Sequence, residues 1–379
     1  MPTTHYAGTK PRSNDLSADQ ADQLDELLVS WDFDHVLVGF SGGKDSLAAL
    51  LAILDAGCPR ELITLCHHDV DGGSEGGEVD PVHLFDWPCT EAYCRAVAGA
   101  LGLRIRFSGR VGGFDREMAR DDVATAPVWF EPLAGGEVQR VGGKGPAGTR
   151  LRFPMLSPDL SRRWCSAYLK IDVMRRVISN DPSLKAADRI LVVTGERAAE
   201  SANRASYARA DLHACHKQTR EVVQYRPVLD WSEADVWGRI QARGIVAHPC
   251  YRAGFGRASC ALCIFGQADQ WATARYLLPA QFAQLVEREA AQVAHWSTDS
   301  DADRASGYLL PQKRPRKGNP APALVGLAAM ADRGTVYPAA QDFEILALAR
   351  STEYTAPVLV DPAEWRLPAG AYATCAGPT

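Results

Sequence analysis

The sequence predicts an α/β protein built on a doubly wound parallel sheet, and three observations carry this prediction. First, an apolar run from Val36 to Phe40 ends in Ser41-Gly-Gly-Lys-Asp-Ser46 and continues into a run of Leu and Ala. This order is typical of a buried strand, a glycine turn and the start of a helix. Second, further apolar runs at 62–66 and 189–194 are flanked by segments of helical periodicity. Third, strands and helices alternate, as in parallel sheets covered by helices.

The remaining elements follow from the same signals. We expect strands at 36–40, 62–66, 103–107, 189–194 and 222–227, and helices at 17–28, 45–56, 90–101, 160–178, 232–242, 267–276 and 279–296. Ser232 with Asp235 resembles a capping box, which marks the start of a helix. Between 109 and 153 the alternation stops and paired glycines recur. We expect a long irregular insertion there, with a short helix at 115–120, that covers the site.

Length and composition indicate a globular protein of more than one part. The chain has 379 residues, of which 46% are hydrophobic and 23% charged. We divide it into a helical lead-in at 1–30, a nucleotide-binding domain at 31–245 with the insertion at 109–153, a cysteine-rich helical subdomain at 246–297 and a partly irregular extension at 298–379. The net charge of −5 gives no general attraction to nucleic acid or to anionic membranes, so any such binding must be local.

Targeting signals and cysteine usage favour the cytoplasm. The polar start, 1–15, has no apolar core of a secretory signal, and no run approaches the roughly 18 apolar residues of a membrane span. Ten cysteines without a signal peptide point to a reducing compartment, where clustered thiols indicate metal binding or catalysis more often than disulfides. We therefore expect a cytoplasmic protein that does not cross a membrane.

The glycine turn has the properties of a phosphate site, and its residues are Ser41, Gly42, Gly43, Lys44, Asp45 and Ser46. Adjacent glycines let backbone N–H groups converge, and a helix N-terminus leaves its first N–H groups unpaired. Lys44 adds a positive charge. The spacing is neither that of a Walker loop nor that of a dinucleotide fingerprint. It resembles the PP-loop of ATP pyrophosphatases, which split ATP between its α and β phosphates. The alternative is an ordinary strand-to-helix turn without a ligand.

Two other predicted strands end in polar segments that should line the same crevice, because ligands bind at the carboxyl ends of parallel strands. After the strand at 62–66, His68 and Asp69 are placed to hold adenine or ribose, and Asp69 or Asp71 is a candidate ligand for Mg²⁺. After the strand at 189–194 come three candidates for phosphate contact, Gly195, Arg197 and Arg204. The alternatives are loop residues without a role and a charged surface helix.

Three cysteines, Cys250, Cys260 and Cys263, lie within fourteen residues, and Cys165 is the best candidate for a fourth ligand. Four cysteines would complete a tetrahedral zinc site or a 4Fe-4S cluster. A single C-x-x-C pair lacks the paired knuckles of zinc ribbons, which favours the 4Fe-4S cluster over zinc. The alternative is a set of unligated thiols.

Taken together, five motifs resemble the phosphoadenosine phosphosulfate (PAPS) reductase family over residues 33 to 290. They are Ser41–Ser46, Arg163-Trp-Cys165 with Lys170, Thr194–Ser201, Arg226-Pro-Val with Trp231 and Trp237, and Cys250 with Cys260-x-x-Cys263. Within that family the sequence is most similar to the ATP-pyrophosphatase component of DNA phosphorothioation systems. That resemblance implies a PP-loop, adenine nucleotide α-hydrolase-like fold with a cysteine-rich helical extension.

Two departures separate the sequence from assimilatory PAPS reductases. Those enzymes usually carry an altered phosphate loop, whereas Ser41–Ser46 is intact, which favours ATP. They also resemble one another in a C-terminal Glu-Cys-Gly tail, whereas this sequence ends in Thr374-Cys-Ala-Gly-Pro-Thr379.

We therefore expect an enzyme that uses ATP with Mg²⁺ to adenylylate an acceptor and release pyrophosphate, so that sulfur can enter. Its expected catalytic residues are Lys44, Asp45 and Arg197. The resemblance implies DNA as acceptor, with tRNA as an alternative, and a cysteine desulfurase as sulfur donor. Two other hypotheses stay open: a PAPS or APS reductase of sulfur assimilation, and a non-catalytic ATP-binding subunit of a phage or defence complex. A homo-oligomer is also left open.

Overall fold

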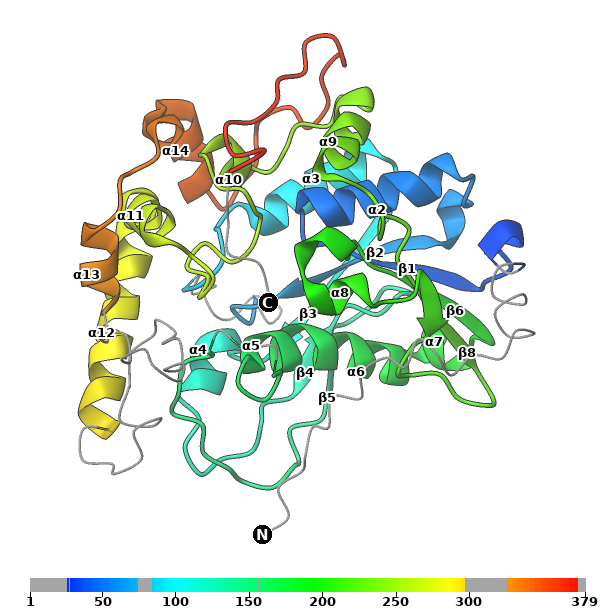
Figure 1. The fold of residues 1–379 in the computed structure, drawn as a ribbon. Helices are drawn as coiled ribbons and strands as arrows, with labels where there is room; N and C mark the ends of the chain where they lie inside the picture. The colour runs from blue at the N-terminus through cyan, green and yellow to red at the C-terminus, as the bar shows by residue number, and fades with distance from the viewer. Residues whose placement is uncertain are drawn as a thin grey trace.

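An eight-stranded sheet forms the centre of the protein, as far as the structure describes it, with the order β5-β4-β3-β2-β1-β6-β8-β7 (Figure 1). The computed structural model describes residues 26, 28–73, 84–155, 157, 159–296 and 326–373. The five strands from β3 through β2, β1 and β6 to β8 run parallel. The flanking strands β4, β5 and β7 are antiparallel. The predicted doubly wound α/β fold is confirmed.

The strands are β1 (His35–Gly39), β2 (Ile63–Asp69), β3 (Arg104–Arg110), β4 (Val128–Phe130), β5 (Gln139–Val141), β6 (Arg189–Val193), β7 (Ala210–Leu212) and β8 (Glu221–Tyr225). The helices of the nucleotide-binding half are α2 (Lys44–Asp55), α3 (Thr90–Ala100), α4 (Gly113–Met118), α5 (Trp164–Ser166), α6 (Asp172–Asn180), α7 (Pro182–Ala186), α8 (Ala202–Ala205) and α9 (Glu233–Ala242). Those that follow are α10 (Pro249–Arg252), α11 (Ala268–Leu277), α12 (Pro279–Trp296), α13 (Leu327–Asp332) and α14 (Phe343–Arg350). Most of the expected helix at 17–28 lies outside the described residues.

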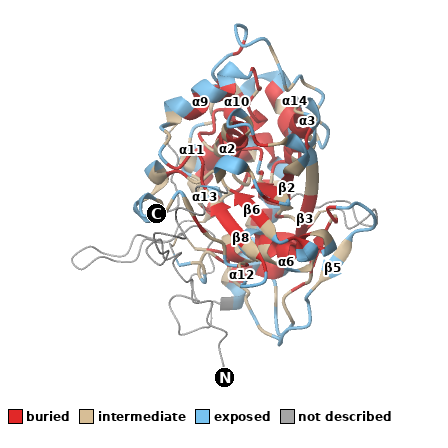
Figure 2. Cartoon of the chain, turned by 90° about the vertical axis from the view of Figure 1, so that its right-hand side faces the viewer, coloured by how far each residue is buried: buried red, intermediate tan, exposed pale blue. Residues whose placement is uncertain are grey.

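The sheet is buried on both faces because successive side chains of a strand point to opposite sides. In β1, Val36 and Val38 join the apolar cluster that contains α2, α3 and α9, whereas Leu37 joins the cluster that contains α6. Figure 1 shows these helices above and below the sheet, and Figure 2 shows the buried strands between them. Strands buried on both faces read as continuous apolar runs, which is why the sequence predicts them.

The segment 109–153 differs from the expected irregular insertion. It carries α4 and the β4–β5 hairpin, which extends the sheet from β3. Each hairpin strand has three residues, too few to give a periodic signal. Among the residues that the structure describes, none from this segment lines the cavity beside the candidate site, so the expectation that the insertion covers the site is not met.

The described part of the C-terminal extension packs on the same apolar core as α2. Leu327, Ile345, Trp365 and Ala371 belong to that cluster. Two tryptophan side chains fix the last segment: Trp365 donates a hydrogen bond to the carbonyl of Ile245 at 2.7 Å, and Trp237 donates to that of Ala371 at 2.9 Å. In the part of the chain that is described, no helix has the length and apolar character to cross a membrane.

The stability of the fold is expected to fall in acid because of His213, which follows β7. Burial lowers the pKa of His213 to about 4, and Arg175 and Arg226 act in the same direction. In the unfolded chain the pKa returns to about 6.5. The neutral, buried ring of His213 therefore makes its full contribution to the free energy of unfolding above about pH 6.5, and this contribution is lost as the pH falls toward 4.

His213→Asn is the matching variant, because Nδ1 of His213 accepts a hydrogen bond from the backbone N–H of Cys215, and an Asn side chain makes the same local contact. In urea unfolding, the free energy of unfolding of the variant should fall less between pH 7 and pH 5 than that of the wild type. The difference should be at most about 1.4 kcal/mol per pH unit, reduced by solvent screening of the partly exposed ring. Identical pH slopes for the two proteins would contradict this role.

Candidate active site

The candidate site lies where the strand order of the sheet reverses. From β1 the chain proceeds to β2 and β3 on one side, whereas β6 and β8 lie on the other. In such sheets the crevice between the two central strands is the usual ligand site. Ser41–Ser46 follows β1 and Thr194–Arg197 follows β6, so the structure brings these two predicted segments together. His68 and Asp69 end the neighbouring strand β2.

Two glycines permit the close approach of these loops. Gly42 has φ +74°, a left-handed conformation that favours glycine, and a Cβ there would lie 3.1 Å from the Sγ of Cys94. At Gly195 a Cβ would lie 2.3 Å from the carbonyl oxygen of Asp45 and 2.6 Å from the backbone nitrogen of Ser46. The loop after β6 therefore rests directly on the first turn of α2.

The phosphate loop is held by its own serines. Oγ of Ser46 donates to the carbonyl of Gly43 at 2.9 Å and accepts from the backbone N–H of Ser41 at 3.3 Å. The backbone N–H of Gly43 donates to Oγ of Ser41 at 3.3 Å. Gly43 is the N-cap of α2 and supplies no side-chain acceptor to the helix. The start of α2 is therefore a preformed turn whose positive dipole end suits an anion.

Lys44 is buried in this turn, with 5% of its surface exposed. Its Nζ lies 3.2 Å from Oδ2 of Asp45 and 3.3 Å from Oε1 of Glu233, the first residue of α9. Burial works against the charged form, but Tyr251, Asp45 and Glu233 together hold the pKa of Lys44 above its usual value. The ammonium is therefore charged and fixed at neutral pH.

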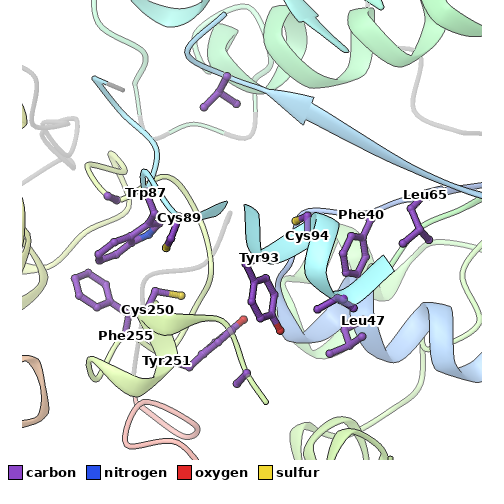
Figure 3. Packing of buried hydrophobic residues seen from close by; sticks show 14 of the residues in the cluster. Phe40, Leu47, Leu65, Trp87, Cys89, Tyr93, Cys94, Cys250, Tyr251 and Phe255 are labelled. Carbon is purple, nitrogen blue, oxygen red and sulfur yellow. The ribbon is translucent and has the colours of Figure 1, made fainter. Parts of the chain in front are cut away.

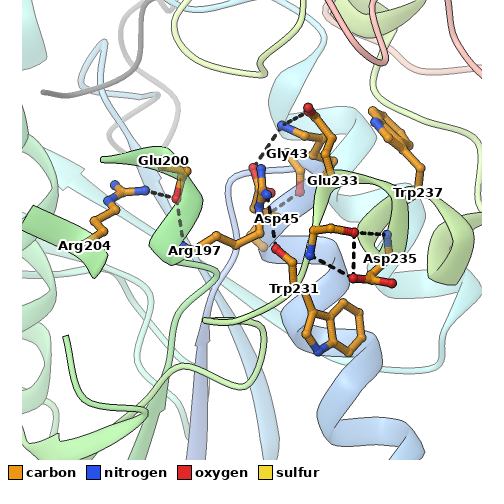
Figure 4. A network of polar contacts seen from close by, with 12 residues as sticks. Gly43, Asp45, Arg197, Glu200, Arg204, Trp231, Glu233, Asp235 and Trp237 are labelled. Atoms are coloured by element: carbon orange, nitrogen blue, oxygen red, sulfur yellow. Dashed lines mark hydrogen bonds and ion pairs between the residues drawn. The ribbon is translucent and has the colours of Figure 1, made fainter. Parts of the chain in front are cut away.

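Arg197 approaches the same turn from the β6 side. Its Nε donates to Oδ1 of Asp45 at 2.6 Å (Figure 4). Since Nζ of Lys44 pairs with Oδ2 of the same carboxylate, Asp45 lies between the two cations. Glu200 accepts the backbone N–H of Arg197 at 2.9 Å and also pairs with the guanidinium of Arg204. The three predicted basic residues, Lys44, Arg197 and Arg204, thus form one chain of contacts linked by carboxylates.

Tyr251, on α10, closes the phosphate loop from the cysteine-rich side. Its hydroxyl accepts a hydrogen bond from the backbone N–H of Lys44 at 3.0 Å. The side chain is 1% exposed and packs edge-on against Trp237, with ring centroids 5.1 Å apart. A phosphate that uses this N–H must displace the phenol.

Tyr251→Phe should therefore weaken the protein and strengthen ligand binding. In the ligand-free variant the backbone N–H of Lys44 has no acceptor, and the lost hydrogen bond costs about 0.5–1.5 kcal/mol of stability. A bound phosphate accepts this N–H and restores the hydrogen bond. We expect a lower melting temperature and a few-fold tighter ATP binding in calorimetry. Tyr276→Phe is the control, because Tyr276 is 40% exposed on α11. Weaker ATP binding by Tyr251→Phe would contradict this role.

A cavity of about 190 Å³ opens beside the loop at the ends of β1 and β2. Its wall includes Ser41, His67, His68, Trp87, Lys170 and Cys260. Lys170 lies in a π-helical turn (Ala167–Ile171) between α5 and α6, and π turns are frequent at functional sites. Aromatic and imidazole rings with a nearby cation suit a nucleobase and its phosphates.

His68 lines this cavity, whereas Asp69 is not among its lining residues. His68 lines the wall, with Nδ1 2.8 Å from Oγ of Ser108, and burial lowers its pKa to about 3, so the ring is neutral. Asp69 turns back into its own loop, where Oδ1 accepts the N–H of Asp71 at 2.7 Å. Asp71 in turn accepts the N–H of Asp86 at 2.8 Å. Both carboxylates thus accept backbone hydrogen bonds, and their role as Mg²⁺ ligands stays a prediction.

The four predicted cysteine ligands fall into two groups. Cys165, Cys260 and Cys263 lie near Lys170. Burial lowers the pKa of Lys170, but these thiols and Asp86 outweigh that effect and raise it. Lys170 also lines the wall of the cavity. Cys250 instead lies in the apolar core with Cys89, Trp87 and Phe255 (Figure 3).

A four-thiolate site needs four sulfur atoms around one centre. Within the described ranges, no group of three or more Cys, His, Asp or Glu side chains has the geometry to hold a metal ion. A 4Fe-4S cluster or zinc at Cys165, Cys250, Cys260 and Cys263 stays a prediction.

Comparison with known proteins gives one matching family and several relatives. Residues 153–265 match the phosphoadenosine phosphosulfate reductase domain. An uncharacterized 37.8 kDa protein of Escherichia phage 186 is 27% identical over 275 residues, which cover 67% of this chain and 74% of the phage protein. The adenosine 5′-phosphosulfate reductase of Neisseria meningitidis is 31% identical over 134 residues, covering 35% of this chain and 48% of that enzyme.

The match thus spans about half the length of the Neisseria reductase. Among solved structures, the PAPS reductase of Candida auris in its phosphate complex superposes with a TM-score of 0.34 at 14% identity, covering 64% of this chain and 95% of that one. The matched segment 153–265 contains β6, the Arg197 loop, Tyr251 and the C-x-x-C pair. Over that segment, the chain is similar to the PAPS reductase family.

Proposed function

We propose that the protein is an ATP pyrophosphatase that transfers AMP to an oxygen-bearing acceptor and releases pyrophosphate. The observation that carries this proposal is the intact Ser41–Ser46 loop at the switch point of the sheet, with Lys44 and Arg197 buried on either side of Asp45. A fixed turn with two cations suits the charge that gathers on departing pyrophosphate. The cavity beside Ser41 gives room for the adenosine.

The reaction is a displacement at the α-phosphorus of ATP. An acceptor oxygen attacks the α-phosphorus, the bond from that phosphorus to the bridging αβ oxygen breaks, and pyrophosphate leaves with the electron pair. ATP enters as its magnesium complex. The N-terminal amides of α2, Lys44 and Arg197 stabilise the leaving group. AMP is then a better leaving group than a bare oxygen, so a sulfur nucleophile can displace it from the acceptor.

The sulfur-handling setting of this reaction is part of the proposal. We infer a DNA backbone phosphate as acceptor, with a tRNA base as the alternative, and a cysteine desulfurase as donor. The family match and the APS reductase relative support an enzyme that acts on nucleotides in sulfur chemistry.

The direct test is pyrophosphate release from ATP, measured with candidate acceptors and a sulfur donor. Ser41→Ala serves as the control for contaminating activity, because it removes the Oγ that accepts the Gly43 N–H without removing a charge. We expect acceptor-dependent pyrophosphate from the wild type and a reduced rate from the variant. Tight ATP binding with no pyrophosphate under any of these conditions would instead support a non-catalytic ATP-binding subunit.

A reductase of APS or PAPS is the second candidate, and the 31% identity to the Neisseria APS reductase favours it. The two activities give different products. Release of sulfite from APS or PAPS in the presence of a thiol, without pyrophosphate from ATP, would replace the first proposal by this one.

A further inference from the structure

Three arginines from separate elements gather beside the phosphate loop. Arg163 precedes α5, Arg204 lies on α8, and Arg257 lies in the loop between α10 and Cys260. Arg163 interacts with both of the others: burial lowers the pKa of Arg163, and the charges of Arg204 and Arg257 lower it further. We call Arg163, Arg204 and Arg257 the arginine cluster.

One aromatic ring positions two members of the arginine cluster. The Cζ atoms of Arg163 and Arg257 lie 6.0 Å and 5.8 Å from the ring centroid of Phe265. A guanidinium stacked on an aromatic ring loses little freedom when it binds, and its N–H groups stay available at its edge. Phe265 therefore positions the two arginines, and it does not accept any of their N–H hydrogen bonds.

These two arginines have donors without acceptors. Nε of Arg163 and Nη1 of Arg257 are buried and have no hydrogen-bond partner among the described residues. Three other buried arginines are ion-paired: Arg197 with Asp45, Arg226 with Glu196, and Arg110 with Asp172. Nε of Arg120 and Nε of Arg220 also lack a partner among the described residues, but neither of these arginines lies in the arginine cluster. Leaving buried charged donors unpaired is costly, so this arrangement indicates an acceptor that is supplied from outside the described chain.

Arg163 and Arg257 adjoin the ATP-binding residues but are not among them, and Arg204 links the two sets. Glu200 accepts the backbone N–H of Arg197 and pairs with Arg204, which fixes one side of the cluster against the phosphate loop. On the other side, Arg163 is two residues from Cys165, and Phe265 is two residues from Cys263. A group bound by the cluster would lie next to the phosphates of ATP.

We propose that Arg163, Arg204 and Arg257 form a second phosphate site, which holds a phosphate of the acceptor while Ser41–Ser46 holds those of ATP. Assignment of the ligand as acceptor rests on the proposed function. Guanidinium groups from several directions match a tetrahedral oxyanion. The phosphate can come from a nucleic-acid strand or from a small phosphate ester, and the two sources differ in salt dependence.

The test compares Arg257→Gln and Arg163→Gln with Arg209→Gln, which removes the same charge from an exposed ion pair with Asp230. Binding of a labelled single-stranded DNA octamer is followed by anisotropy, and binding of inorganic phosphate and of ATP by calorimetry. We expect the cluster variants to bind the phosphate-bearing probe about tenfold more weakly. ATP affinity should stay within about twofold, and Arg209→Gln should behave as wild type.

The probes separate the two phosphate sources. If the source is a nucleic acid, the octamer binds, and each cluster variant lowers the slope of log affinity against log salt by about one. If the source is a small ester, inorganic phosphate shows the loss and the octamer does not bind. Arg257→Lys and Arg163→Lys, which keep the charge, should regain part of the affinity; they replace any Gln variant that fails to fold.

Unchanged affinity for both probes in the cluster variants would overturn the site, as would an equal loss of ATP affinity, which would assign the arginines to the nucleotide. These outcomes are independent of the proposed reaction. If pyrophosphate release is absent but the cluster variants still lose the probe, the phosphate site stands without the proposed function. If pyrophosphate release is normal and the probes are unaffected, only the second site fails.

Discussion

Replacing Lys44 with alanine is expected to lower acceptor-dependent pyrophosphate release by about 10²–10³-fold, the usual effect of removing one preorganised donor from a developing charge. Lys44 is buried at the start of α2, and its pKa lies above the usual value, so its charge is present at all working pH values. Lysine also neutralises Glu233, whose carboxylate would otherwise face the incoming phosphates at the same spot. The variant therefore both loses a cation and uncovers an anion.

Steady-state kinetics should show this loss mainly in kcat, because the charge that Lys44 stabilises grows as pyrophosphate departs. The double variant Lys44→Ala with Glu233→Gln should recover part of the activity, since it removes the uncovered carboxylate. Lys185→Ala is the control for a lysine on a surface helix, α7. A Lys44→Ala rate within threefold of wild type would remove Lys44 from the machinery.

The parallel core could be predicted from sequence because its strands are buried on both faces. Val36–Phe40 and 189–194 are unbroken apolar runs, and such runs bounded by turn residues have few alternative readings. The antiparallel strands could not be predicted in the same way. β4, β5 and β7 have three residues each, which is too short for an alternating apolar pattern to show in the sequence. The π turn that places Lys170 also leaves no mark in a helical periodicity.

The phosphate loop and the Arg197 loop could be placed together from sequence, because both follow parallel strands whose carboxyl ends meet at one edge. Tyr251 and Glu233 were missed. Tyr251 contacts Lys44 across 207 residues, and nothing local marks a tyrosine as a partner for a backbone amide. The capping box at Ser232 located the start of α9, which puts Glu233 in its first turn, but its pairing with Lys44 is a tertiary contact.

The local surroundings of the four predicted cysteine ligands could not be predicted from sequence. Pro249 starts a short helix, α10, that places Cys250 in the apolar core next to Tyr251. Cys165 is distant from Cys263 in sequence, but the two thiols interact in the fold. Burial raises the pKa of Cys165 to about 11, and the thiol of Cys263 adds to that rise.

Gly195→Ala is expected to lower both the stability of the protein and its activity. The new Cβ would meet the carbonyl oxygen of Asp45 at 2.3 Å, and backbone atoms at the start of a helix cannot move aside as a flexible side chain can. Overpacking of this kind costs about 1–3 kcal/mol of unfolding free energy. Relief of the clash must separate the loop after β6 from α2, which draws Arg197 away from Asp45.

The two consequences of Gly195→Ala can be separated by experiment. Denaturant unfolding gives the loss of stability, and pyrophosphate release at a temperature where the variant is fully folded gives the loss of activity, expected at about 10²-fold for a displacement near 1 Å. Gly99→Ala is the matched control: Gly99 lies in α3, where an added Cβ meets no atom within 4 Å, so this variant should gain about 0.5–1 kcal/mol. If Gly195→Ala unfolds like wild type and keeps its activity, then the two loops do not need their close approach, and the arrangement of Lys44, Asp45 and Arg197 cannot be what organises the site.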